Sequence, residues 1–311
     1  MNIMTTSKTK TELWINENIT PWDIYSHGIK EILVYKKTPY QEMYIVESES
    51  YGKALILDGK WQSCVGDEFI YHESLVQPAM ITHQFVKKAL ILGGGEGATI
   101  REILRWKSIE KVTMIDIDGE VVAACQKHLL EMHQNCFDDP RVELIIDDAL
   151  KILDKISGKW DIIISDLSDP IEEGPSFPLF TKEYFAKLQK VLSPQGLVII
   201  QSGQVSPPFI KYHARLVNTL KAVFPQVNSY CAPTPTYGSP WGFAICGNQV
   251  LNTFPDPGFV DDLLATQTTG GLRLIDGQTL LGMLQTPLYI RDAISKCTDV
   301  YTFDKPPKFF S

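Results

Sequence analysis

Acidic residues stand at the points where four predicted strands of the chain end. They are Glu96 after the first strand, Asp116 and Asp118 after the second, Asp147 and Asp148 after the third, and Asp166 and Asp169 after the fourth. Each of them alone is compatible with a helix cap or a turn. Ligands of open α/β sheets bind outside the carboxyl ends of the strands, so the repetition at four strands indicates one acidic site. The set holds no Arg or Lys to pair with a phosphate or carboxylate, and it therefore favours a positively charged ligand.

A glycine-rich loop, Gly93-Gly-Gly-Glu-Gly97, separates the first of these strands from a helical pattern. Glycine lets a backbone approach a ligand closely, and a helix N-terminus offers free N–H groups. Gly93, Gly95 and Ala98 satisfy the dinucleotide pattern G-x-G-x-x-A, whereas the three glycines at 93, 95 and 97 equally satisfy G-x-G-x-G, which suits S-adenosyl ligands. Glu96 favours the second interpretation, because a carboxylate repels a pyrophosphate and attracts a cation. A turn without a ligand remains the alternative.

The spacing of the acids supports a nucleoside. Asp116 lies 21 residues after Gly95, where an acid typically binds the ribose hydroxyls. Asp148, at the next strand, is placed to accept a hydrogen bond from an adenine amino group. Glu96 and Asp166 then remain for the other end of the ligand, which we expect to be an adenosine that carries positive charge, beside a cationic second substrate.

Alternating strands and helices must position these residues. Beyond residue 84 the chain predicts strands at 89–92, 112–117, 142–146, 160–165, 196–201, 227–231 and 242–247, and helices at 98–107, 119–132, 149–155, 182–192 and 209–223. Residues 12–80 read as β-rich, with strands at 31–36, 42–47 and 53–57 and a hairpin turn at Asp58-Gly59. The predicted fold class is α/β: a small antiparallel β domain (1–80) precedes a Rossmann-like, doubly wound and mostly parallel sheet of the S-adenosylmethionine-methyltransferase type (81–311). Residues 250–311 are expected to pack on that sheet.

Composition excludes several classes of protein. The 311 residues carry a formal net charge of −8, which argues against a general nucleic-acid binder. No apolar run reaches the length of a membrane span, and the polar start lacks the apolar region of a signal peptide. Six cysteines without a C-x-x-C pair predict reduced thiols in a cytoplasmic protein. His128 and His133 are five residues apart, a poor pairing on one helix face, and we expect no metal site.

Several separated motifs resemble the polyamine aminopropyltransferase family, in which spermidine synthase is the best-known activity. The motifs, within residues 12–250, are Tyr40-Gln41-Glu42, Leu57-Asp-Gly-Lys-Trp-Gln62, Asp67-Glu-Phe-Ile-Tyr-His-Glu73, Gly93-Gly-Gly-Glu-Gly97, Asp116-Ile-Asp118, Asp148-Ala149, Asp166-Leu-Ser-Asp-Pro170 and Pro235-Thr-Tyr237. The resemblance implies that an aminopropyl group moves from decarboxylated S-adenosylmethionine to an amine, with release of methylthioadenosine. It implies a small-molecule amine as partner, a homodimer or homotetramer, and no cofactor beyond this co-substrate.

The resemblance also implies a role for individual residues. The nucleoside donor would be bound by Gln41, Gly93, Gly95, Glu96, Asp116, Asp148 and Ala149. Asp166 would be the catalytic carboxylate. The amine site would be formed by Tyr71, His72, Asp169, Gln201 and Tyr237, with Gln62 beside it. The chemistry agrees, because an amine with a pKa of ~10.4 is protonated at neutral pH and needs a carboxylate to orient it and accept its proton.

The preferred acceptor amine is left open. Leu167 stands where many spermidine synthases have a polar residue. This leucine and the run Glu172-Glu-Gly-Pro175 resemble the corresponding sequences of thermospermine synthases and agmatine-using enzymes. The tyrosine at position 237 is typical of spermidine synthases, so putrescine is the expected acceptor. Thermospermine or spermine synthase, agmatine aminopropyltransferase and, more distantly, an S-adenosylmethionine-dependent methyltransferase are the alternatives. We also expect the Pro- and Gly-rich segment Leu167–Thr181 to close over the site.

Overall fold

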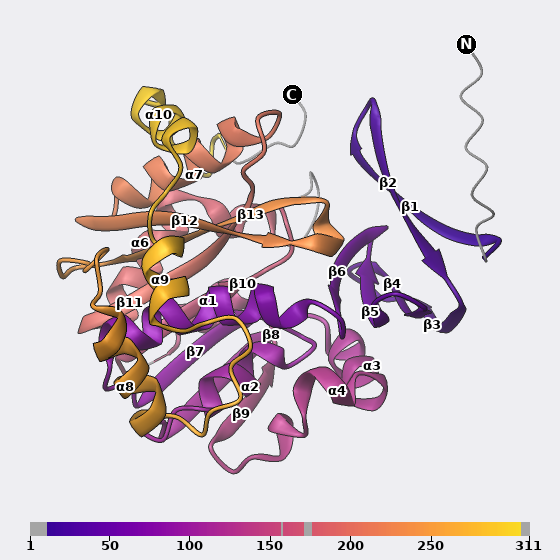
Figure 1. The fold of residues 1–311 in the computed structure, drawn as a ribbon, viewed down its shortest axis with the longest axis horizontal. Coiled ribbons are helices and arrows are strands. Elements are labelled where there is room, and N and C mark those ends of the chain that lie inside the picture. The colour runs from indigo at the N-terminus through magenta and orange to yellow at the C-terminus, as the bar shows by residue number, and fades with distance from the viewer. Residues whose placement is uncertain (1–10, 157, 171–175, 306–311) are drawn as a thin grey trace.

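Three β-sheets organise the chain in the computed structural model, which describes residues 11–156, 158–170 and 176–305 (Figure 1). The first two sheets are small and antiparallel. They comprise the pair β1 (Leu13–Thr20) and β2 (Asp23–Ile29), and the four strands β3 (Glu31–Lys37), β4 (Glu42–Ser48), β5 (Gly52–Leu57) and β6 (Lys60–Cys64). Asp58 and Gly59 form the β5–β6 hairpin turn with positive φ angles of 48° and 72°, as the sequence predicts.

The third sheet has seven strands in the order β12-β13-β11-β10-β7-β8-β9. Their bounds are β7 (Lys88–Gly93), β8 (Lys111–Asp116), β9 (Val142–Ile146), β10 (Trp160–Asp166), β11 (Leu192–Gln204), β12 (Gln226–Thr234) and β13 (Ser239–Gly247). The five strands from β11 to β9 are parallel, and β13 and β12 complete the sheet antiparallel. The strand order reverses between β7 and β10, so their carboxyl ends form the crevice in which such sheets bind ligands. The predicted fold class is confirmed.

Helices cover both faces of this sheet (Figure 1). They are α1 (Glu68–His83), α2 (Ala98–Leu104), α3 (Gly119–His128), α4 (Leu130–His133), α5 (Ala149–Leu153), α6 (Lys182–Val191), α7 (Ile210–Lys221), α8 (Pro257–Gln267), α9 (Gly277–Met283) and α10 (Leu288–Lys296), with 3-10 turns at Cys136–Asp138, Phe177–Phe180 and Pro235–Tyr237. The helices α1, α2, α8 and α9 bury apolar side chains on one face, whereas α5, α6, α7 and α10 bury theirs on the other. The described part of the expected C-terminal segment, residues 250–305, thus packs on the sheet as predicted, with helices on both faces.

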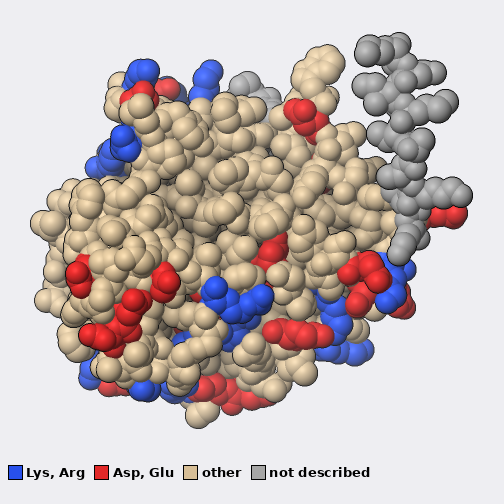
Figure 2. Space-filling model, in the orientation of Figure 1, with Lys and Arg blue, Asp and Glu red and all other residues tan. Residues whose placement is uncertain are grey.

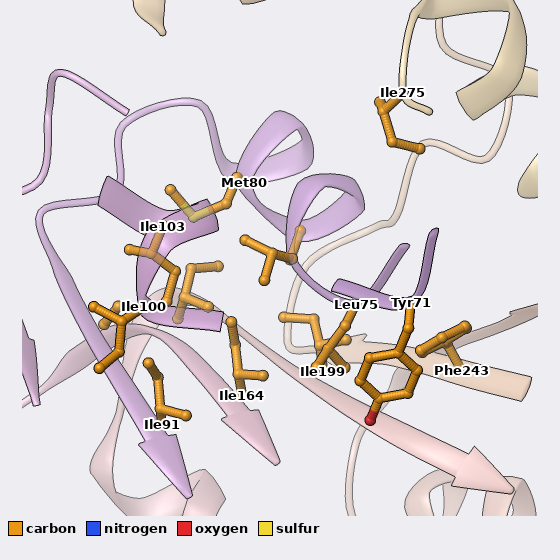
Figure 3. Close-up of a cluster of buried hydrophobic side chains, with 14 of the residues drawn as sticks. Tyr71, Leu75, Met80, Ile91, Ile100, Ile103, Ile164, Ile199, Phe243 and Ile275 are labelled. Atoms are coloured by element: carbon orange, nitrogen blue, oxygen red, sulfur yellow. The ribbon is translucent and has the colours of Figure 1, made fainter. Parts of the chain in front are cut away.

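Figure 3 shows how the first of these faces is filled. Ile91 of β7, Ile164 of β10 and Ile199 of β11 meet Leu75 and Met80 of α1. All five are fully buried. Parallel strands covered on both faces need apolar side chains throughout, which explains the nearly continuous apolar runs in these strands.

The helix α1 is the largest departure from the sequence analysis, because the β-rich interpretation of residues 12–80 is wrong beyond Glu68. Polar residues are buried around the helix, among them His72 and Glu73, so it lacks the amphipathic pattern that predicts a surface helix. Pro78 also lies inside it and cannot donate a hydrogen bond to the carbonyl of Ser74. The hydroxyl of Tyr230 donates to that carbonyl at 2.8 Å instead, so the buried acceptor is satisfied.

Smaller departures concern strands and helix ends. The structure adds the strands β1, β2 and β6 to those that the sequence predicts, and the expected helix at 98–107 ends at Leu104. The expected helix at 119–132 breaks at Leu129, whose ψ of 41° separates α3 from α4. The helix α1 (Glu68–His83) runs across residue 81, where the predicted second domain begins, and it packs on the seven-stranded sheet.

The molecular surface agrees with the composition. On the face drawn in Figure 2, basic and acidic side chains of the described residues alternate along the lower part instead of forming one basic surface. None of the described helices combines the length and the apolar character that crossing a bilayer requires.

Candidate active site

A cavity of about 480 Å³ lies at the carboxyl ends of β7, β8 and β10, where the small β-sheets meet the large one. The β-sheets at the N-terminus contribute Gln41, Leu55 and Trp61 to its wall, and the large sheet contributes the glycine loop and the acids. Twelve of the thirteen residues expected at the site line this cavity: Gln41, Tyr71, Gly93, Gly95, Glu96, Asp116, Asp148, Ala149, Asp166, Asp169, Gln201 and Tyr237. His72 is fully buried behind Glu96 and is the exception.

Asp166 ends β10 in the middle of the cavity wall. Its Oδ1 accepts a hydrogen bond from the Tyr71 hydroxyl at 2.8 Å, and its Oδ2 accepts one from the Thr99 hydroxyl at 2.5 Å. Burial and the nearby Glu96 carboxylate raise its pKa, while the two hydroxyl donors oppose that shift. A carboxylate that is held in one orientation and has a raised pKa is suited to accept a proton.

The glycine loop lies directly against Asp166. Gly93 has a φ of 83°, and a Cβ at this position would stand 2.2 Å from the backbone oxygen of Asp166. The N–H of Gly94 donates to the same oxygen at 3.0 Å. Only glycine permits this approach, which brings the loop and the end of β10 together.

Asp116, at the end of β8, lines another part of the cavity, and Asp118 lies buried next to it. Asp116 accepts a hydrogen bond from the backbone N–H of Asp118 at 2.9 Å, and burial raises its pKa to about 7. Asp118 caps α3 and accepts hydrogen bonds from Thr38 at 2.6 Å and from the Gln41 amide at 3.0 Å. Asp118 therefore caps a helix, which is one of the two structural roles that its position in the sequence allows. It also connects Gln41 to the large sheet through a hydrogen bond.

Asp148 and Ala149 begin α5 beside Asp116. The Asp148 side chain caps this helix by accepting from the N–H of Leu150 at 2.9 Å, and it remains half-exposed at the cavity wall. Its second oxygen lies 3.7 Å from the exposed ammonium group of Lys151 and can still accept a hydrogen bond from a ligand, so capping and binding are compatible at this residue.

The far end of the cavity combines an acid with aromatic rings. Gln201 donates to Asp169 at 3.0 Å and accepts from the indole N–H of Trp241 at 3.0 Å, which fixes both neighbours. Burial raises the pKa of Asp169 to about 6. The Tyr237 ring packs edge-on against Tyr71 and Trp241, with centroids 5.9 and 4.7 Å away, and its hydroxyl donates to the backbone oxygen of Gln62. A carboxylate among aromatic faces is suited to an ammonium group.

His72 joins two carboxylates. Its Nδ1 lies 2.8 Å from Glu68 and its Nε2 lies 2.9 Å from Glu96. Burial alone would lower the pKa of His72, but the hydrogen bonds with both acids raise it well above the usual value. The imidazolium in turn lowers the pKa of Glu96, although burial opposes this.

His72, Glu96 and Asp166 also bring potential metal-ligand atoms within 4.8 Å of one another. Each ring nitrogen of His72 already faces a carboxylate oxygen, and a doubly hydrogen-bonded imidazolium has no lone pair to offer a metal. The donor set therefore fits a chain of charged hydrogen bonds better than a metal centre, and the prediction of no metal is retained.

Several residues at the site were not expected from the sequence. Thr99 lies in the first turn of α2 and binds Asp166. Glu17 of β1 lines the cavity and accepts from the backbone N–H of Trp61 at 3.1 Å, and Lys60 lies 3.3 Å from Glu17. The position of Thr99 directly after the glycine loop was an available signal, whereas nothing local indicates that β1 reaches the site. Of the expected closing segment, residues 171–175 lie outside the described residues.

Comparison with known proteins agrees with this geometry. Residues 68–256 match the family model of the spermine/spermidine synthase domain, and residues 13–64 match that of the spermidine synthase tetramerisation domain. A polyamine aminopropyltransferase of a Synechococcus species is 49% identical over 309 residues, which cover 97% of this chain and 99% of the relative. One from Aeropyrum pernix is 40% identical over 294 residues, which cover 94% and 93%.

Two solved structures share the whole architecture. A spermidine synthase in complex with the transition-state analogue AdoDATO superposes with a TM-score of 0.86 at 26% identity and covers 93% of this chain and 97% of its own. The spermidine synthase of Thermotoga maritima gives a TM-score of 0.84 at 25% identity, with the same coverage. Sequence matches, fold and the acidic cavity agree, and the chain belongs to the spermine/spermidine synthase family of aminopropyltransferases.

Proposed function

We propose that the protein transfers the aminopropyl group of decarboxylated S-adenosylmethionine to putrescine and releases methylthioadenosine. The observation that carries the proposal is the single cavity that joins Asp116, Asp166 and Asp169 with the glycine loop. Gln41, Glu96, Asp116 and Asp148 would bind the donor, while Tyr71, Asp169, Gln201 and Tyr237 would hold the amine. No cofactor is required beyond the co-substrate.

The reaction needs one proton acceptor and close alignment. Asp169 would hold the ammonium group, and Asp166 would accept its proton as the freed lone pair attacks the methylene carbon bound to the sulfonium. The carbon–sulfur bond breaks, its electron pair stays on sulfur, and a neutral thioether leaves without needing an acid. Alignment of two bound reactants can supply ~7–11 kcal/mol of the barrier reduction.

The assembly and location of the protein are part of this proposal. A homodimer or homotetramer is supported by the match of residues 13–64 to a tetramerisation domain and by exposed apolar residues on the hairpin formed by β1, β2 and the turn between them. These include Trp14, Trp22 and Ile24. The six free cysteines, four of them buried, suit the reducing cytoplasm.

An acceptor panel tests the proposal. The purified protein is incubated with the decarboxylated donor and putrescine, spermidine or agmatine, and methylthioadenosine and the new amine are quantified by chromatography and mass spectrometry. We expect one methylthioadenosine per aminopropylated amine and the highest kcat/KM with putrescine. A higher kcat/KM with spermidine or agmatine would establish an alternative acceptor, and no transfer to any of the three would contradict the proposal.

A further inference from the structure

Four charged side chains form a line from α2 to the cavity. The guanidinium of Arg101 donates to both carboxylate oxygens of Glu68 at 2.8 and 2.9 Å. Glu68 lies 2.8 Å from Nδ1 of His72, and Nε2 of His72 lies 2.9 Å from Glu96. The charge alternates along the line, and none of the four residues is more than 8% exposed. Only Glu96, at the end, lines the cavity.

Glu96 needs such support because it shares the cavity with six other acids, among them Asp116, Asp166 and Asp169. Burial raises the pKa of Asp116, Asp166 and Asp169, and Glu96 adds to the shift of the first two. Glu96 differs from these three: burial raises its pKa, but the hydrogen bond and the positive charge of His72, together with a backbone hydrogen bond, outweigh burial, so its pKa is lowered. The ionisable groups that face Glu96 and His72 are Glu68 and Tyr71 on α1, Arg101 on α2 through Glu68, Asp116 on β8, Cys125 on α3, Asp166 on β10 and Tyr237 in its 3-10 turn.

A second buried histidine shows that His72 would not carry a proton unaided. His213 is also fully buried, but its ring nitrogens face the hydroxyls of Ser202 and Ser229 at 3.0 and 2.8 Å. Without a carboxylate partner, burial lowers the pKa of His213 to about 4. The pKa of His72 is raised instead because two carboxylates bind its ring. One of them, Glu68, stays an anion because His72 and Arg101 lower the pKa of Glu68 to about 2 against the effect of burial.

We propose that Glu68 and Arg101 are positioning residues for the donor. They hold His72 as an imidazolium, and through it they fix the orientation and the negative charge of Glu96 toward the cationic aminopropyl end. The inference rests on the proposed function for the identity of the ligand, but the state of His72 is a property of the protein alone. Methylthioadenosine lacks the aminopropyl group, so the line should favour binding of the charged donor and leave the neutral product unaffected.

The test compares Glu68→Gln with Glu102→Gln. Glu102 is equally buried and also binds Arg101, at 2.9 Å, but it does not contact His72. In Glu68→Gln, affinity for decarboxylated S-adenosylmethionine at pH 7 should fall about 10-fold, while affinity for methylthioadenosine stays within about twofold. The acid limb of kcat/KM for the donor should move up by about one pH unit, because His72 then loses its proton and with it the positive charge that lowers the pKa of Glu96. Glu102→Gln should change the melting temperature without changing either readout.

Nuclear magnetic resonance of the histidine rings supplies a readout without substrate. The His72 ring, assigned by its loss in His72→Gln, should stay protonated at pH 8 in the parent protein and titrate at lower pH in Glu68→Gln. Arg101→Lys, which keeps the charge and loses the paired hydrogen bonds, should give a smaller shift in the same direction. A His72 ring that is neutral at pH 8 in the parent, or equal losses of donor and product affinity in both Gln variants, would overturn the inference. If only the proposed function is wrong, aminopropyl transfer would be absent, while His72 would still be protonated at pH 8 in the parent protein and titrate at lower pH in Glu68→Gln.

Discussion

Asp166 has both oxygens occupied by hydroxyl donors before any substrate binds. Tyr71 and Thr99 hold it at 2.8 and 2.5 Å, so its orientation does not depend on the ligand. Substitution by asparagine keeps the shape and removes the charge and the basicity. Since positioned proton transfer contributes typically ~100- to 10,000-fold, Asp166→Asn should lower turnover by at least ~100-fold.

Three measurements on Asp166→Asn separate chemistry from binding. Steady-state kinetics should show the lost turnover and a pH optimum moved upward, because free amine must then come from bulk solvent. Calorimetry should show nearly unchanged methylthioadenosine affinity, and the melting temperature should change little. Near-normal turnover at pH 7 would mean that Asp166 is not the base.

Asp116 predicts a pH dependence of nucleoside binding. With a pKa raised to about 7 by burial, its carboxyl is largely protonated in the free protein below that pH. Charged hydrogen bonds to the ribose require the anion, so the affinity for methylthioadenosine should fall as the pH drops from 8 to 6. Asp116→Ala should lose about 1.5–3 kcal/mol of binding free energy at pH 8 and show a flat profile. Titration calorimetry at several pH values measures both, and a flat profile in the parent protein would contradict the ribose assignment.

The same carboxyl has the opposite effect on the free protein's stability. Its pKa is raised on folding, so the folded state binds the proton more tightly than the unfolded state, whose pKa lies near 3.9. The stability it contributes is complete below about pH 4 and is lost as the pH rises to about 7. Ligand-free protein and nucleoside complex should therefore respond to pH in opposite directions.

At the scale of single residues, the sequence predicts which residues lie at the site better than it predicts which side chains they contact. The acids were found because they follow apolar runs, which is a local pattern. Glu68 and Arg101 have no such pattern, because they meet only when α1 and α2 pack side by side, whereas Thr99 does have a local signal in its position just after the glycine loop. The capping of α5 by Asp148 and its place at the cavity wall are also compatible, which no local pattern can reveal.

Among the elements, the loop between β7 and α2 has the least freedom. A Cβ on Gly93 would stand 2.2 Å from the backbone oxygen of Asp166, and its φ of 83° strains any other residue. Gly93→Ala should destabilise the fold by at least about 2 kcal/mol and abolish methylthioadenosine binding.

Gly282→Ala in α9 is the matched control, since its Cβ would meet nothing within 4 Å. It should be neutral or stabilising by up to about 1 kcal/mol in urea unfolding. Equal effects of the two substitutions would refute this account.

Strands were predicted well and α1 was not, for one physical reason. Parallel strands buried on both faces are apolar throughout, so they stand out from the chain. The helix α1 is also buried on most sides, but its apolar contacts through residues such as Leu75 and Met80 are mixed with buried charge pairs, and the Tyr230 hydroxyl replaces a missing backbone donor. Its sequence therefore shows neither an apolar face nor freedom from proline. Closure by residues 167–181 stays a prediction.

In the whole molecule, several hydrogen bonds link the two parts that form the cavity, and the one between Thr38 and Asp118 is buried. Thr38, from the segment between β3 and β4, donates to Asp118 at the start of α3 at 2.6 Å. Thr38→Val should cost about 1–3 kcal/mol of unfolding free energy and weaken donor binding, because Gln41 shares Asp118. Thr266→Val, at an exposed hydroxyl of α8, is the control and should cost less than about 0.5 kcal/mol. Chemical denaturation and calorimetry decide this, and equal costs would argue against the link.

Because the cavity wall comes from two packed parts of the protein, binding of a ligand in the cavity and the packing of these two parts are thermodynamically linked. A ligand that touches both Gln41 and Asp166 bridges the joint between the sheets, and it does so only while the joint is closed. Free ligand at 100 times its dissociation constant adds about 2.7 kcal/mol to the folded state. The joint then opens roughly 100-fold less often. The supply of the nucleoside donor would thus set the lifetime of the protein against proteases, as well as its rate of turnover.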